Sequence, residues 1–204
     1  LFAYAQLLIA IGMTDGRYGT TKTPRKFWAR WREEVLAEAH FKAIKNQALE
    51  TDPREALLKD RLSEVKDHFV SLWSEEQAVT EQDRLLISLC APDRLLEMVR
   101  SFLFFDRKAG KIIARHQQFF GIKALLDQIG VVRPDGAREG GVIWHTTGSG
   151  KSFTMVLLCK ALLLDEALKR CRVVVVTDRR DLEKQLAGNF LTGGAFGTDL
   201  ADKE

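Results

Sequence analysis

The sequence predicts a mixed α/β fold, in which a mostly helical first half precedes a second half built on parallel strands. Two observations lead to this prediction. An apolar run at Gly141–His145, a glycine-rich stretch, a long apolar segment and a valine-rich run at Arg172–Thr177 follow one another over about 35 residues, the size of a strand–helix–strand unit. In the first half, charged and apolar residues alternate at helical spacing over Pro24–Asn46 and Pro53–Trp73.

Length and composition describe a globular chain. It has 204 residues, enough for one large domain or two small ones, and 46% of them are hydrophobic. The formal net charge of +3 is too mild to imply nucleic-acid binding by the chain as a whole, so any basic surface must be local.

Cysteine usage and hydropathy indicate a cytoplasmic protein. Cys90, Cys159 and Cys171 lack metal-ligand spacing and are read as reduced thiols. No stretch is apolar for the roughly 18 residues that a membrane span needs, and the apolar start at Leu1 lacks the features of a signal peptide. Because the sequence starts in mid-pattern without Met, we expect it to be a piece of a longer protein.

The first half is expected to hold one hairpin followed by helices. The turn-forming residues Thr14–Gly16 favour a strand and hairpin over the first 12 residues and beyond. A further helix is expected to open at Pro92, and Phe102–Phe105 is expected to be a short aromatic strand before a turn at 106–110. The inward-facing stripes of the three helices are Phe27, Trp28, Trp31, Val35, Leu36 and Ala39; Leu57, Leu58, Leu62, Val65, Phe69 and Leu72; and Leu95, Leu96 and Val99. These stripes are interpreted as packing between helices.

The second half is expected to form a strand–loop–helix–strand unit. Lys151–Leu164 is apolar on nearly every side, as in a helix that lies against a sheet. The four valines of Arg172–Thr177 are typical of a parallel strand that is buried on both faces. Asp165 and Glu166 follow the helix too closely to be the acidic end of a further strand, so they are read as the helix's polar end.

The loop between Trp144 and Ser152 has the chemistry of a phosphate-binding loop. Thr147–Ser152 fits the end of the pattern G-x-x-x-x-G-K-[ST], in which backbone N–H groups surround a phosphate at the start of a helix. Gly148 and Gly150 are free to take positive φ. Lys151 is expected to reach the β- and γ-phosphates as the catalytic cation, and the Ser152 hydroxyl to ligate Mg²⁺. His145 stands where the pattern has its first glycine, and a plain glycine turn is the alternative reading. The expected nucleotide contacts are Thr146, Thr147, Gly148, Ser149, Gly150, Lys151 and Ser152.

Two flanking segments resemble those of helicase-type motors. After the valine run, Thr177 and Arg179 stand where such motors contact a nucleic-acid backbone. Upstream, the stretch from Arg115 to Phe120 places two glutamines where these motors read the adenine edge, a task that suits an amide. Gln118 matches the adenine-reading glutamine of these motors best, and Gln117 is the second candidate for this role. The alternative interpretation is that both glutamines belong to an ordinary polar helix start.

Taken together, these segments resemble the restriction (R) subunit of type I restriction-modification enzymes, a superfamily 2 helicase-like motor. The resemblance rests on LFAYAQLLIAIG with RYGT, on FLFFDRKAGKIIARHQQFFGIKAL, and on GGVIWHTTGSGKSFTM and RVVVVTDRRDLEKQL. It runs nearly end to end, and a histidine before TTGSGKS is usual for the family. The last two segments are the most specific.

This resemblance implies the start of a RecA-like P-loop motor lobe with a parallel sheet, over residues 107–204. It implies the C-terminal edge of a nuclease domain, a remnant of β-sheet, over residues 1–22, and a mostly helical connector over residues 23–106. The implied activity is ATP- and Mg²⁺-dependent translocation of double-stranded DNA followed by cleavage. The implied partners are that DNA and the modification (methyltransferase) and specificity subunits, with no membrane.

The same resemblance implies that the chain is inactive alone. The family's nuclease carboxylates are expected upstream of Leu1, and its acidic Walker B residues and arginine finger beyond Glu204. Without them, phosphoryl transfer lacks most of its electrostatic stabilisation.

Other functions stay open at this stage. One is a superfamily 2 helicase or remodelling ATPase without a nuclease. A small-molecule P-loop kinase is disfavoured because a long helical region precedes the loop. A purely structural adaptor leaves Lys151 and Ser152 unexplained.

Overall fold

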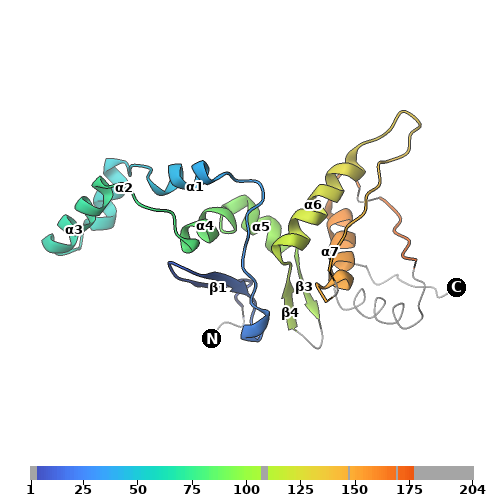
Figure 1. Ribbon diagram of the computed structural model, residues 1–204, viewed down its shortest axis with the longest axis horizontal. Coiled ribbons are helices and arrows are strands. Elements are labelled where there is room, and N and C mark those ends of the chain that lie inside the picture. The colour runs from blue at the N-terminus through green and yellow to red at the C-terminus, as the bar shows by residue number, and fades with distance from the viewer. Residues whose placement is uncertain (1–3, 107–109, 147, 169, 177–204) are drawn as a thin grey trace.

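The computed structural model describes residues 4–106, 110–146, 148–168 and 170–176. Within these ranges the chain is mixed α and β, with helices around two short antiparallel hairpins (Figure 1). One hairpin joins β1 (Leu8–Ile11) to β2 (Gly16–Gly19), and the other joins β3 (Leu103–Asp106) to β4 (Gly110–Ile113).

The N-terminal hairpin is confirmed. Leu8 pairs with Gly19 and Ile11 with Gly16 across the turn that the sequence predicts. A third segment extends this pairing, because Tyr18 and Ala29 exchange two backbone hydrogen bonds of 2.9 Å.

The helix predicted over Pro24–Asn46 is wrong for its middle part. Only the 3₁₀ turn η1 (Arg25–Phe27) and helix α1 (Glu38–Lys45) form there. Between them the chain runs without helix, since the bridge at Ala29 holds it extended. Trp31 is buried at 7% exposure, whereas Phe27 is 52% exposed, so the two do not share one inward helical stripe.

The helix predicted over Pro53–Trp73 is split into α2 (Thr51–Leu58) and α3 (Ser63–Ser74). Its stripe is not packed between helices: Leu57 is 61% exposed and Leu62 is 72% exposed. Figure 1 shows these two helices at one end of the molecule, away from the hairpins. Apolar residues at helical spacing predict a helix with one apolar face. They do not show that another element packs against that face.

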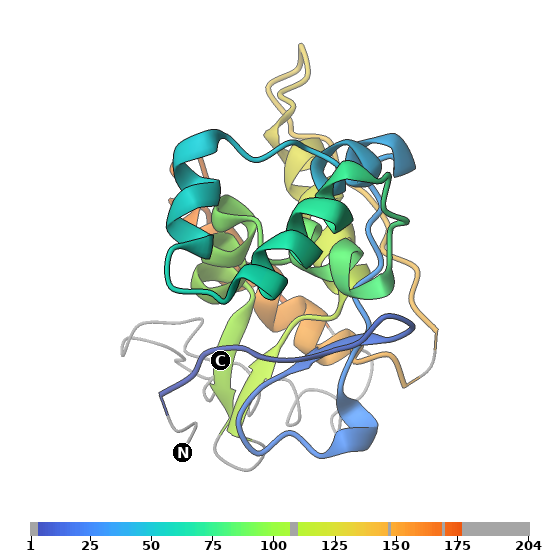
Figure 2. The same cartoon turned by 90° about the vertical axis from the view of Figure 1, so that its left-hand side faces the viewer.

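Helices α4 (Glu81–Ser88) and α5 (Pro92–Ser101) lie above the N-terminal hairpin (Figures 1 and 2). The helix start at Pro92 is confirmed, but Leu96 points outward, with 68% exposure, and Met98 takes the fully buried position instead.

Two helices form in the second half, and the one predicted over Lys151–Leu164 is confirmed. They are α6 (His116–Gly130) and α7 (Lys151–Leu164), which pack on each other beside β3 and β4 (Figure 1). The buried side chains of α7 include Val156, Leu157 and Leu162. Asp165 is the C-cap of α7, as expected for the polar end of the helix.

The two predicted parallel strands do not form within the described residues. Neither 141–145 nor 172–176 is a strand there, and both described sheets are antiparallel. Val142 and Trp144 are each 90% exposed, and Val176 is 88% exposed. A strand needs a hydrogen-bonded neighbour, and no described segment pairs with either run. Thr177, at the end of the second run, lies outside the described residues.

One hydrophobic core joins the parts of the chain. It contains Tyr18 of β2, Trp31, Met98 of α5, Phe119 of α6 and Leu157 of α7. Trp31 contacts the Phe119 ring edge-on, with 5.4 Å between ring centroids. This core takes residues from each of the three predicted regions, so it fixes the N-terminal hairpin against α6.

Other sequence-based expectations concern the cysteines and hydropathy. The three cysteines are free, and burial raises the pKa of Cys159 to about 11. In the part of the chain that the structure describes, no helix is long and apolar enough to cross a membrane.

Substitution of Trp31 tests this core. We expect Trp31→Ala to lower the free energy of unfolding by about 3–5 kcal/mol, because a buried aromatic ring is lost from a packed cluster. Trp73→Ala is the control, since Trp73 on α3 is 40% exposed and should cost less than about 1 kcal/mol. Urea unfolding of the two variants measures the difference; equal losses would contradict this description of the core.

Candidate nucleotide-binding site

The start of α7 presents backbone donors that no described residue satisfies. The helix begins at Lys151, and its N-cap Gly150 has a left-handed backbone with φ 91°. Gly148 is also left-handed, with φ 79°, so both glycines adopt the backbone that the sequence predicts for them. Among the described residues, no acceptor contacts the N–H groups of Lys151, Ser152 and Phe153. A helix start of this kind carries a partial positive charge that favours an anion.

The rest of the loop is held by its own hydrogen bonds. Both the backbone N–H and the hydroxyl of Ser149 donate to the Thr146 carbonyl, at 3.3 and 2.7 Å. The Gly150 carbonyl accepts from the N–H of Thr154 at 3.0 Å and from its hydroxyl at 3.3 Å. Thr147 lies outside the described residues.

Gln118 connects this loop to the start of α6. Its side chain is buried at 4% exposure. Its Oε1 accepts from the N–H of Arg115 at 2.9 Å, which caps α6. Its Nε2 donates to the Gly150 carbonyl and to the Thr154 hydroxyl, both at 3.2 Å. One amide therefore bonds to the starts of two helices.

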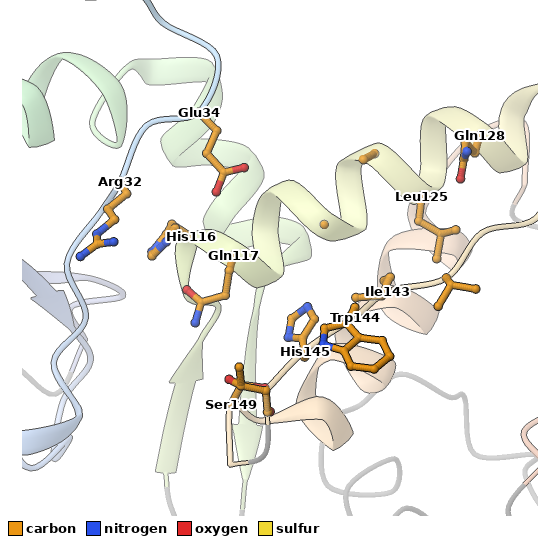
Figure 3. Close-up of a pocket in the computed structure, with 14 residues that line it drawn as sticks. Arg32, Glu34, His116, Gln117, Leu125, Gln128, Ile143, Trp144, His145 and Ser149 are labelled. Atoms are coloured by element: carbon orange, nitrogen blue, oxygen red, sulfur yellow. The ribbon is translucent and has the colours of Figure 1, made fainter.

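Gln117 faces a different cavity. This cavity, the α6 pocket, has a volume of about 810 Å³ and lies along α6. Figure 3 shows Gln117 and His116 at the start of α6, His145 and Ser149 in the segment before α7, and Arg32 on the segment before α1. The Gln117 Oε1 is buried and has no hydrogen-bond partner among the described residues.

A second cavity, the loop pocket, lies on the glycine side of the loop. It has a volume of about 790 Å³. Gln118 and Gly148, Ser149 and Gly150 line it, together with Phe153. Its opposite wall comes from the N-terminal part of the chain, and its cations are Lys22, Lys111 and Arg115. No carboxylate is among its described lining residues, so its charge is positive.

Lys151 and Ser152 are the remaining predicted site residues that the structure describes. Lys151 is exposed and Ser152 is half-buried, both on the first turn of α7. The described residues hold no cluster of three or more metal-ligating side chains. Arg179 lies outside the described residues, as Thr177 does.

The sequence analysis did not single out the N-terminal wall of the loop pocket. Lys22, Thr23 and Phe27 line it from the segment after the first hairpin. Nothing in their spacing links them to a loop so far along the chain. The one local feature of the sequence that could have drawn attention to this wall is Lys22, which stands between Thr21 and Thr23.

One family model matches part of the chain. Residues 117–202 match the family described as SWI2/SNF2 ATPase. This range covers Gln118, the loop and α7. The match therefore extends beyond the loop motif on both sides.

The chain is also similar to endonuclease subunits of type I restriction enzymes. The chain is 41% identical over 118 residues to the type I restriction enzyme HindI endonuclease subunit of Haemophilus influenzae, an alignment that covers 55% of the chain and 11% of that protein. It is 28% identical over 197 residues to the MjaIXP endonuclease subunit assigned to a type I restriction enzyme of Methanocaldococcus jannaschii, over 93% of the chain and 17% of that protein. The predicted similarity to the R subunits of type I restriction enzymes is confirmed, and the chain spans only a small part of these relatives.

Replacing each glutamine in turn separates their structural roles. We expect Gln118→Ala to lower the free energy of unfolding by about 2–3 kcal/mol, because it removes a buried amide, leaves the Arg115 N–H without its acceptor and takes one donor from the Gly150 carbonyl and the Thr154 hydroxyl. Gln117→Ala, the matched control, should change stability by less than about 0.5 kcal/mol, since its buried oxygen has no partner to lose. Chemical denaturation measures both values. Equal effects would contradict the role assigned to Gln118.

Proposed function

We propose that the chain binds ATP with Mg²⁺ at the loop before α7. The observation that carries this proposal is the set of N–H groups at the start of α7 that contact no acceptor among the described residues, beside a cavity with cations and no described carboxylate. Anionic phosphates fit such a site, and the aromatic and aliphatic side chains of the loop pocket, among them Phe153 and Ile113, offer apolar contact for a base.

Each loop residue has a proposed role. The N–H groups from Gly148 to Ser152, with Thr146 and Thr147 at the loop's start, surround the phosphates. Lys151 neutralises the β- and γ-phosphates as the catalytic cation. The Ser152 hydroxyl is a ligand of Mg²⁺, and bound Mg²⁺ supplies charge neutralisation between the phosphates.

Gln118 is the proposed adenine reader. It lines the loop pocket, whereas Gln117 lines the α6 pocket away from the two glycines. Because both ends of the Gln118 amide already bond within the chain, a base would have to replace its contacts with Gly150 and Thr154. Binding of the base is therefore linked to the start of α7.

For the whole protein, we propose the function of an R subunit. It would bind double-stranded DNA, use ATP to translocate it and then cleave it, in a complex with modification and specificity subunits. In this proposal residues 1–22 are the edge of the nuclease domain, 23–106 the connector and 107–204 the first part of the motor lobe. The similarity of the chain to named endonuclease subunits supports this proposal.

A remodelling or helicase ATPase without a nuclease is the second candidate. The match to SWI2/SNF2 ATPases favours it over a small-molecule kinase. The two candidates differ in one measurement on the longer protein that would contain this chain. ATP-dependent cleavage of DNA supports the R subunit, and DNA-stimulated ATP hydrolysis without cleavage supports the second candidate.

Removal of the loop lysine tests nucleotide binding. We expect ATP with Mg²⁺ to bind the chain weakly and Lys151→Ala to reduce its affinity at least about tenfold, because a charge contact worth about 1.4 kcal/mol or more is lost. Ligand-observed NMR titration can measure such weak affinities. Unchanged affinity in the variant would contradict the proposed site.

Hydrolysis gives a separate prediction. The chain should not hydrolyse ATP, since no described carboxylate lines the loop pocket to hold Mg²⁺ or position water. Phosphate release by the wild-type chain should therefore equal that of Lys151→Ala. Steady release well above this control would disprove the prediction.

DNA contact by the tail is a further proposal, with Thr177 and Arg179 as its residues. We expect Arg179→Ala to weaken DNA binding and to lower the slope of log affinity against log salt by about one. Arg61→Ala is the control, because Arg61 is exposed in the turn between α2 and α3. If Arg179→Ala and Arg61→Ala have the same DNA affinity and the same salt slope, the proposed DNA contact of Arg179 is contradicted.

A further inference from the structure

Residues 17–32 form a basic segment that begins in β2 and continues beyond it. The segment contains six of the chain's 31 Lys and Arg residues and none of its 28 Asp and Glu residues. The rest of the chain therefore carries slightly more carboxylates than cations. The mild net charge of +3 thus comes from one local stretch of the chain.

Two tryptophans hold the basic segment in place. The indole N–H of Trp28 donates to the Thr23 carbonyl at 3.0 Å, and the Trp28 ring lies so close to Gly19 that a Cβ there would be 3.1 Å from it. Trp31 is buried in the hydrophobic core, and its indole N–H donates to Glu33 at 3.0 Å. A segment fixed in this way presents its charges with little further loss of conformational freedom on binding.

The outer cations of the segment face solvent. Arg25 and Lys26 are exposed on η1, and neither is among the residues that line the loop pocket or the α6 pocket. Side chains of an extended chain alternate between two sides, so the burial of Trp31 directs Arg30 and Arg32 to the opposite side, about 6.6 Å apart. Both arginines are exposed.

These cations follow one another along the chain. Figure 1 shows the chain rising from η1, below the N-terminal hairpin, to α1 above it. The span from Arg25 to Arg32 is at most about 25 Å. A line of charges of this length suits a linear polyanion.

The cations differ in their ion pairs. Arg17 and Arg30 both pair with Asp15, each at 2.7 Å, so two cations share one carboxylate and together keep a positive charge. The two cations of η1 and Arg32 form no ion pair among the described residues. Their charges therefore stabilise no described part of the fold by ion pairing and are available to an external anion.

We propose that the basic segment binds the phosphate backbone of double-stranded DNA through its outward cations, which are Arg25, Lys26, Arg30 and Arg32. Each strand of a duplex carries one phosphate charge per about 3.4 Å of its axis, so a span of about 25 Å faces several phosphates. Such contacts give affinity and fix the position of the protein on the duplex, but they do not select a base sequence. The inference rests on the DNA partner of the proposed function. It adds a DNA-binding surface outside residues 117–202, which match the ATPase family.

Removal of charge at η1 tests this surface. The first variant combines Arg25→Gln with Lys26→Gln, and Arg32→Gln is a separate variant that tests the extended part. The control combines Lys59→Gln with Arg61→Gln, which removes the same charge from the turn between α2 and α3. All five side chains are exposed, so the thermal unfolding midpoints of the three proteins should equal that of the wild-type chain.

The measurement is fluorescence anisotropy of two labelled duplexes of unrelated sequence, titrated with the chain at several salt concentrations and without nucleotide. We expect the slope of log affinity against log salt to fall by about two in the η1 variant and by about one in Arg32→Gln. The η1 variant should bind both duplexes at least about fivefold more weakly at about 0.1 M salt, because two phosphate contacts are lost. The control variant should keep the wild-type affinity and slope.

Unchanged affinity and slope in the η1 variant and in Arg32→Gln, or an equal loss in the control, would overturn this surface. A loss confined to one of the two duplexes would overturn contact with phosphates. Binding to phosphatidylglycerol vesicles that is as tight as binding to the duplex would overturn DNA as the ligand. No DNA binding by the wild-type chain at low salt would overturn this surface and the tail contact together. ATP-dependent DNA cleavage by the longer protein tests the R-subunit function separately, so failure of the two proposals can be told apart.

Discussion

The buried amide of Gln118 is the contact on which the candidate site depends. It accepts the Arg115 N–H at the start of α6 and donates to Gly150 and Thr154 at the start of α7. Because these partners are buried or half-buried, losing the amide would leave the Arg115 N–H without its acceptor and would remove a donor from Gly150 and Thr154. The bond to Gly150 helps to hold the left-handed glycine at the N-cap of α7, which leaves the next N–H groups free to bind an anion.

The hydrophobic core places the other wall of the site. Tyr18 and Trp31, from the N-terminal part, pack with Phe119 on the first turns of α6. The segment that carries Trp31 is held by Glu33, which pairs with Arg94 on α5 and accepts the indole N–H of Trp31 at 3.0 Å. Aromatic packing and a partly buried ion pair together keep the N-terminal hairpin close to the loop, so one cavity borders both.

The sequence predicted the features that depend on local chemistry. The start of α7 at Lys151 and the positive φ of Gly148 and Gly150 follow from the glycine loop and the apolar segment after it. The extended segment around Trp31 was not predicted, because its conformation depends on the bridge between Tyr18 and Ala29 and on Arg94, contacts that no local pattern reveals. The strand at 141–145 failed for a related reason: strand pairing needs a neighbour, whereas β-branched composition indicates only a preference.

The central claim is that the N–H groups at the start of α7 are free and hold the phosphates of ATP. The most direct measurement is the backbone amide NMR spectrum of Gly150, Lys151 and Ser152 during titration with ATP and Mg²⁺. The account predicts fast hydrogen exchange at these amides without nucleotide, and downfield shifts with slowed exchange as ATP binds. Amides that are already protected without nucleotide, or that do not change at saturating ATP, would contradict it.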